Sequence, residues 1–185
     1  MKKIGPKGRK WLKAFHLLFA AMWTGGGVGL LLLFFLLPTD DGAALYGYNR
    51  GMRVIDDFLI IPGAMGCLLT GLIYSIWTGW GFFKHHWITV KWVITLVGVL
   101  FGTFFLGPWL NSLAPIAREL GGAAINDPTY AYNLQMNRLF APIQVASIVF
   151  ALYISTLKPW RREKKKKKKE DERVEDKEVS PQTSE

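Results

Sequence analysis

The stretch from Trp11 to Leu37 constrains this chain more than any other part of its sequence. From Ala14 onward it is apolar apart from His16 and Thr24. A helix that rises about 1.5 Å per residue over such a run is long enough to cross a bilayer core of roughly 30 Å. The run is also about twice as long as the apolar part of a signal peptide, and no small-x-small cleavage site follows it. Residues 11–37 are therefore predicted to be an uncleaved transmembrane helix.

Three further hydrophobic stretches, at about 56–77, 87–110 and 137–157, have the length and composition of membrane spans. The connections at 38–55 and 111–135 are polar and are interpreted as loops, the second with room for a short surface helix. Pro62 is expected to kink the second span. The sequence thus predicts an all-α fold, an integral membrane four-helix up-and-down bundle that occupies residues 11–158.

The basic residues lie mainly at the two ends of the chain. The formal net charge is +9, residues 1–13 contain no acid, and residues 164–169 are six consecutive lysines. Such flanks favour a multi-pass protein of the cell membrane with a basic arm (1–10) and a disordered tail (159–185) in the cytoplasm. They favour anionic lipids over nucleic acid as partners. A homo-oligomer is compatible with this pattern, and the single cysteine, Cys67, excludes an intrachain disulfide framework.

Polar residues within the spans are the candidate functional groups, because ionisable side chains in a bilayer need a partner or a ligand. His16 and Lys91 each lie a few residues into a helix that starts on the same side, so they are expected at similar depth, together with Tyr74. His16 is either a ligand to a haem or metal ion, a hydrogen-bonded interface histidine or a proton relay. Lys91 either snorkels to the headgroups or holds an anionic group such as a haem propionate.

Other polar groups give weaker signals. His85 or His86 could supply a second axial ligand if their loop folds over the end of the bundle. Arg138 could pair with Asp56 or Asp57 across the bundle. Soft copper(I) ligands are present, but they do not form a paired motif on any span; they are Met22, Met65, Met136 and Cys67.

Each span has one face of small or hydrogen-bonding residues, which is predicted to point into the bundle. On the first span this face carries His16, Ala20, Trp23 and Gly27. Gly25 and Gly29 add a small-xxx-small step that is expected to allow close helix packing. The corresponding faces of the other spans consist of Gly63, Gly66, Thr70 and Tyr74; of Lys91, Thr95, Gly98 and Gly102; and of Gln144, Ser147, Ala151 and Ser155.

These motifs resemble a group of bacterial integral membrane proteins. It comprises an uncharacterised predicted membrane protein family, the copper-resistance D family and the HemJ-type protoporphyrinogen oxidases. The shared pattern is a histidine, then Trp-x-Gly, then a lysine early in a later span, matched here by His16, Trp23 with Gly25, and Lys91. The resemblance implies roles for His16 and Lys91 in haem binding. The chain departs from the HemJ type at residues 28–31, which lack the expected arginine, and from the copper-resistance family in lacking outward-facing Met and His residues.

Three functional hypotheses follow. The first is a protein that binds haem b or a related porphyrin for electron transfer or porphyrin redox chemistry, with His16, Lys91, Trp23 and Tyr74 at the cofactor and with His16 and His86 on the metal. The second is a small permease or a copper- or metal-handling protein whose polar stripes line a path. The third is a membrane scaffold that acts through its lysine-rich tail.

Overall fold

The computed structural model describes residues 4–37, 41–78, 81–82 and 86–157, and every regular element in this part is helical. Within these residues, four helices are long and apolar enough to cross a membrane. The first long helix is α1 (Pro6–Leu36), and the fourth is α6 (Pro128–Leu157). The second is continuous through α2 (Gly42–Ile55), η1 (Asp56–Ile60) and α3 (Ile61–Trp77). The third is continuous through α4 (His86–Phe101), η2 (Gly102–Leu106) and α5 (Gly107–Leu120), and it is followed by η3 (Gly121–Asn126). This confirms the all-α class and the four spans as elements of a multi-pass membrane protein.

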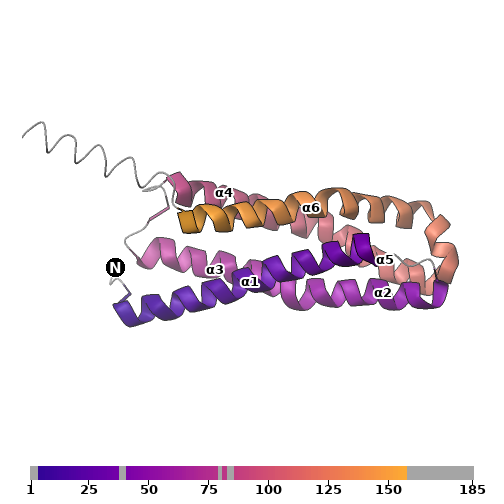
Figure 1. Cartoon of the computed structure of the whole chain (residues 1–185), viewed down its shortest axis with the longest axis horizontal. Coiled ribbons are helices and arrows are strands. Elements are labelled where there is room, and N and C mark those ends of the chain that lie inside the picture. Colours follow the sequence, from indigo (N-terminus) through magenta and orange to yellow (C-terminus); the bar gives the residue numbers. More distant parts are fainter. Residues whose placement is uncertain (1–3, 38–40, 79–80, 83–85, 158–185) are drawn as a thin grey trace, which may run out of the picture.

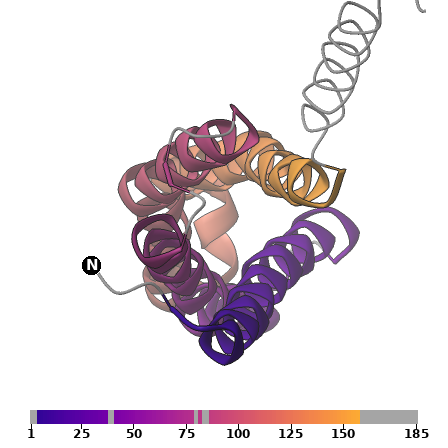
Figure 2. The same ribbon diagram turned by 90° about the vertical axis from the view of Figure 1, so that its left-hand side faces the viewer.

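The four long helices run alternately in opposite directions, as predicted (Figure 1). Viewed along the bundle axis, α1, α3, α4 and α6 lie at the corners of a four-sided arrangement (Figure 2). The start of α1 lies beside the end of α3, where the Ile4 N–H donates a hydrogen bond to the Trp77 carbonyl at 3.0 Å. The start of α1 and the end of α6 share one end of the bundle, here called the near end (Figure 1). The cytoplasmic location of that end stays a prediction, and the tail at 159–185 lies outside the described residues.

At the opposite end, the loop prediction for 38–55 is wrong over most of its length, and the segment 111–135 is helical well beyond the short surface helix that was expected there. Residues 42–55 form α2, and residues 111–135 continue α5, form η3 and begin α6. These segments pack together into a helical far-end cap, defined as residues 42–55 and 111–136, which also receives Leu30 and Phe34 of α1. Its most deeply buried side chains include Leu45, Met52, Leu113 and Ala124.

Local signals explain why these polar segments are helical. In α2 the apolar residues Leu45, Tyr48, Met52 and Ile55 recur every three or four positions and so form one buried stripe. α5 ends at Leu120, and the residue that follows, Gly121, has a positive φ of 54°, which suits a glycine after a helix. The Asp127 carboxylate then accepts a hydrogen bond from the Tyr130 N–H at 2.8 Å, which caps the start of α6.

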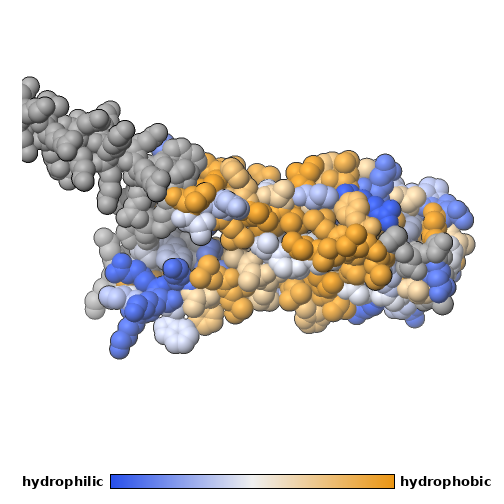
Figure 3. All heavy atoms as spheres, viewed as in Figure 1, coloured by the Kyte–Doolittle hydropathy of each residue, from blue (hydrophilic) through white to orange (hydrophobic). Residues whose placement is uncertain are grey.

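The surface shows how the bundle fits a bilayer. A band of hydrophobic residues covers its middle, and hydrophilic residues gather at both ends (Figure 3). The helix from Ala44 to Trp77 has 34 residues, which corresponds to about 51 Å, well beyond the roughly 30 Å of a bilayer core. The bundle therefore projects from the hydrocarbon region, and the polar outer faces of the far-end cap belong to the projecting part.

Glycine lets α1 approach its neighbours closely on the faces that were predicted to point inward, but not at the predicted step of Gly25 and Gly29. A Cβ atom added at Gly63 of α3 would lie 2.6 Å from the Trp23 backbone nitrogen, and one added at Gly27 would lie 2.8 Å from a Val145 methyl group of α6. At Gly25 and Gly29 an added Cβ would meet nothing within 4 Å. The predicted packing step at Gly25 and Gly29 is therefore wrong, because those two positions point away from the neighbouring helices.

The second and third long helices each contain one π-helical turn just before a proline. In η1 the Ile61 N–H donates to the Asp56 carbonyl, and in η2 the Gly107 N–H donates to the Gly102 carbonyl. Pro62 and Pro108 follow one residue later and have no N–H to donate. The wider turns thus lie where a proline interrupts the ordinary i→i−4 ladder, a position at which π-turns commonly mark functional regions.

Candidate functional site

His16 is held by a threonine of the second long helix. Its Nδ1 lies 2.7 Å from the Thr70 hydroxyl oxygen, which itself donates to the Gly66 carbonyl at 2.6 Å. When the Thr70 hydroxyl donates its one proton to the Gly66 carbonyl, it accepts a hydrogen bond from His16. In this arrangement Nδ1 is the protonated nitrogen, and Nε2 keeps its lone pair. This is the tautomer in which a histidine can act as a ligand through Nε2 while a second group fixes its ring.

Three further side chains surround His16. The Tyr74 ring meets the imidazole edge-on, with ring centroids 6.1 Å apart and an interplanar angle of 82°. The Cys67 thiol lies 3.9 Å from the His16 carbonyl oxygen. Lys91 on α4 is half-buried and lies close enough to act electrostatically on both His16 and Cys67. Within the described residues its ammonium group has neither a hydrogen bond nor an ion pair, so it is available to an anion.

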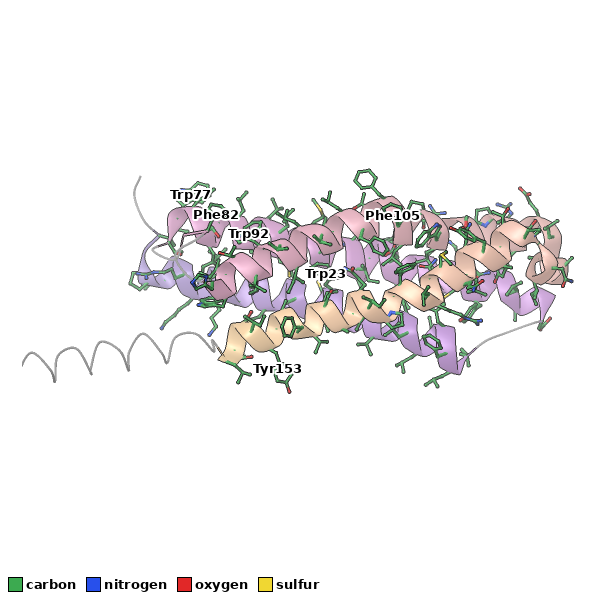
Figure 4. All side chains as sticks on the ribbon, turned by 90° about the horizontal axis from the view of Figure 1, so that it is seen from above. Trp23, Trp77, Phe82, Trp92, Phe105 and Tyr153 are labelled. Atoms are coloured by element: carbon green, nitrogen blue, oxygen red, sulfur yellow. The ribbon has the colours of Figure 1, made fainter. Side chains whose placement is uncertain are left out.

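Trp23 and His86 do not lie beside the His16 imidazole. Trp23 is midway along the bundle, whereas Trp77, Phe82 and Trp92 gather at the near end (Figure 4). It packs in a buried cluster with Ala64 and Cys67, about two helical turns along α1 from His16. His86 is exposed at the start of α4, and His85 lies outside the described residues. In the part of the chain that the structure describes, no three His, Cys, Asp or Glu residues are grouped as a metal site.

A second feature, which the sequence did not predict, is a cavity of about 570 Å³ in the middle of the bundle. All four long helices line it, beginning at Trp23 and extending towards the far-end cap. The glycines Gly98 and Gly102 contribute to its wall, as do both π-helical turns. The volume falls in the range of small-molecule sites, roughly 300–1,000 Å³.

Three polar groups of this central cavity, Asp56, Asn111 and Asn137, lie towards the far-end cap, whereas Gln144 lies beside Gly98. Asp56 and Asn137 line it with only 8% and 2% of their surfaces exposed, and Asn111 and Gln144 lie on its wall. Sequence reasoning assigned Asp56 to a helix start or an ion pair and did not single out Asn111 or Asn137 as functional. The sequence did contain one signal for this site: Pro62 and Pro108 interrupt long apolar helices, and the π-helical turns that line the cavity directly precede them.

The predicted ion pair of Arg138 with Asp56 or Asp57 across the bundle is wrong. Arg53 Nε lies 3.6 Å from the Asp57 carboxylate on the same helix. A spacing of four residues places these two side chains on one helix face, so Asp57 has a local partner. Within the described part of the chain, Arg138 forms no ion pair, and its Nε is buried without a hydrogen bond.

Comparison of the chain with protein-family models, with curated proteins and with solved structures gives no match.

Proposed function

We propose that this membrane protein binds a b-type haem or related porphyrin near one end of its bundle, with His16 as an axial ligand. The observation that carries the proposal is the orientation of the imidazole: Thr70 accepts from Nδ1, which leaves the Nε2 lone pair free for iron. The sequence resemblance to haem-linked membrane families, at His16 and Lys91, supports the same assignment.

The surroundings of His16 suit such a cofactor. Lys91 is a half-buried cation without a partner among the described residues, and a haem propionate is an anion of the kind that it would bind. Tyr74 packs its ring edge-on against the imidazole and limits the rotation of the ligand. When bound, haem supplies one-electron redox chemistry, while these residues hold and orient it.

The test is an absorption spectrum of the full-length protein, purified in mild detergent from haem-replete cells and recorded before and after dithionite. We expect a Soret band that is lost in His16→Ala. Thr70→Val keeps the shape of the side chain but removes the acceptor for Nδ1, and it is expected to weaken haem binding about 10–100-fold. His86→Ala is the control, because His86 is exposed at the start of α4, and it should keep the band.

Each other result has a defined meaning. A colourless wild-type preparation would contradict haem binding altogether. A Soret band that survives in His16→Ala would assign the axial ligand to another residue. Loss of the band in His86→Ala would make His86 the second axial ligand.

A further inference from the structure

Within the described residues, the central cavity is lined by one ionisable side chain, and its carboxylate forms no hydrogen bond or ion pair. Of the described residues that line it, only Asp56 carries an ionisable side chain. Asp56 is 8% exposed and its carboxylate has no hydrogen bond or ion pair within the described chain, whereas the neighbouring Asp57 is paired with Arg53. An ionised carboxylate that is removed from water without a partner is costly, and such residues inside membrane proteins usually mark binding sites.

The amide side chains that share this end of the cavity with Asp56 have oxygen atoms that can accept hydrogen bonds from a ligand. The Asn137 amide nitrogen donates to the Asn133 carbonyl at 3.1 Å, so its amide oxygen is the atom left for a ligand. The Asn111 amide oxygen is buried and accepts no hydrogen bond from the described residues. This end of the cavity therefore offers acceptors and a carboxylate to its occupant, and a molecule with several N–H donors and a positive charge satisfies them.

The cavity opens sideways between α3 and η2. On α1 and α6 the lining residues are buried or half-buried, as for Trp23, Phe34 and Asn137. On the opposite side, Ile61 and Met65 of α3 and Thr103 of η2 line the cavity and are also exposed. α3 and α4 pack together only sparsely, unlike α1 and α3. This opening lies among exposed apolar side chains, including Phe104 and Phe105, which indicates access from the bilayer.

We propose that the central cavity is a binding site for a lipid-soluble organic cation, which enters from the bilayer between α3 and η2 and places a primary ammonium group against Asp56. The apolar walls contributed by Leu30, Ile60 and Leu106 hold the hydrocarbon part of the molecule. The amide oxygens of Asn111 and Asn137 accept the remaining N–H donors of the ammonium group. This site is separate from the His16 group and does not depend on haem.

The experiment compares two fluorescent probes that differ only in the head group: a dansyl-labelled alkyl chain that ends in a primary amine, and the same chain ending in a hydroxyl. Both are titrated into the full-length protein in mild detergent. We expect the amine to bind at least about tenfold more tightly than the alcohol, as for hydrogen bonds to a charged partner. Asp56→Asn keeps the size of the side chain and should abolish this preference. Asp57→Asn is the matched control and should preserve it, because Asp57 is paired with Arg53 instead.

A cavity-filling variant gives a second, independent measurement. A Cβ added at Gly102 would meet nothing within 4 Å, so Gly102→Leu is expected to fold and to reduce the space in the cavity. Both probes should then bind at least about tenfold more weakly. Equal affinity of the wild-type protein for amine and alcohol would overturn the cation proposal, as would full amine affinity in Asp56→Asn. Unchanged binding of both probes to Gly102→Leu would place their site elsewhere.

Discussion

Two glycines that look alike in the sequence, Gly63 and Gly29, should respond oppositely to substitution by alanine. At Gly63 the added Cβ would lie 2.6 Å from the Trp23 backbone nitrogen and 2.9 Å from the Phe19 carbonyl oxygen. Both of these are backbone atoms of α1, so relief requires the two helices to separate. At Gly29 the added Cβ would meet nothing within 4 Å.

The two changes share one favourable contribution, since alanine in place of glycine inside a helix gains about 0.5–1 kcal/mol. Gly29→Ala should therefore be stabilised by about that amount. Gly63→Ala has the same gain but adds the cost of overpacking, typically about 1–3 kcal/mol. The expected difference between the two variants is thus about 1–3 kcal/mol, with Gly63→Ala the less stable.

Reversible unfolding of both variants in detergent, followed by circular dichroism against the wild-type protein, measures this difference. The reasoning depends on the contact between α1 and α3, so a disulfide or fluorescence probe between those helices should report their separation in Gly63→Ala alone. Equal stability changes in Gly63→Ala and Gly29→Ala would refute the close approach of α1 and α3 at Gly63.

Two further predictions concern the far-end cap. Tyr130→Phe removes the hydroxyl that accepts a hydrogen bond from the fully buried Asn49 at 3.0 Å, so it should lower the free energy of unfolding by about 1–3 kcal/mol. Its control is Tyr132→Phe, which changes an exposed residue and should leave that free energy nearly the same. Leu113→Ala leaves a cavity where a side chain of 0% exposure was packed, and it should lower the free energy of unfolding by about 2–5 kcal/mol. Leu120 is 46% exposed, so Leu120→Ala should change that free energy by no more than about 0.5 kcal/mol. Urea or thermal unfolding in detergent measures both pairs, and a Leu113→Ala variant as stable as the wild-type protein would mean that residues 111–120 do not pack as α5.

The four spans and most of their inward faces could be predicted from the sequence, because they depend on properties of each helix alone. The length of an apolar run decides whether it can cross a bilayer, and the helical repeat decides which residues share a face. Ala20, Trp23, Gly63 and Thr70 are buried as those patterns indicate. A similar depth for Lys91 and His16 was predicted by counting residues from the membrane surface, while the hydrogen bond of His16 to Thr70 was not predicted.

The far-end cap was missed because polarity was taken as a sign of loops. Residues 42–55 and 111–136 carry enough charge to leave the membrane core, but their apolar residues recur at helical spacing. These helices are stable because they cover one another and the end of α1, which is a property of the assembled bundle.

The distinction between Asp56 and Asp57 shows what tertiary structure alone decides. Adjacent residues of a helix point about 100° apart, so only one of the two carboxylates can face the cavity. Local sequence explains why Arg53 pairs with Asp57, four residues away, but it does not show which side of the helix the other three helices cover. Hydropathy thus determined that the chain crosses a membrane, and packing decided that Asp56 lies inside the bundle without a partner.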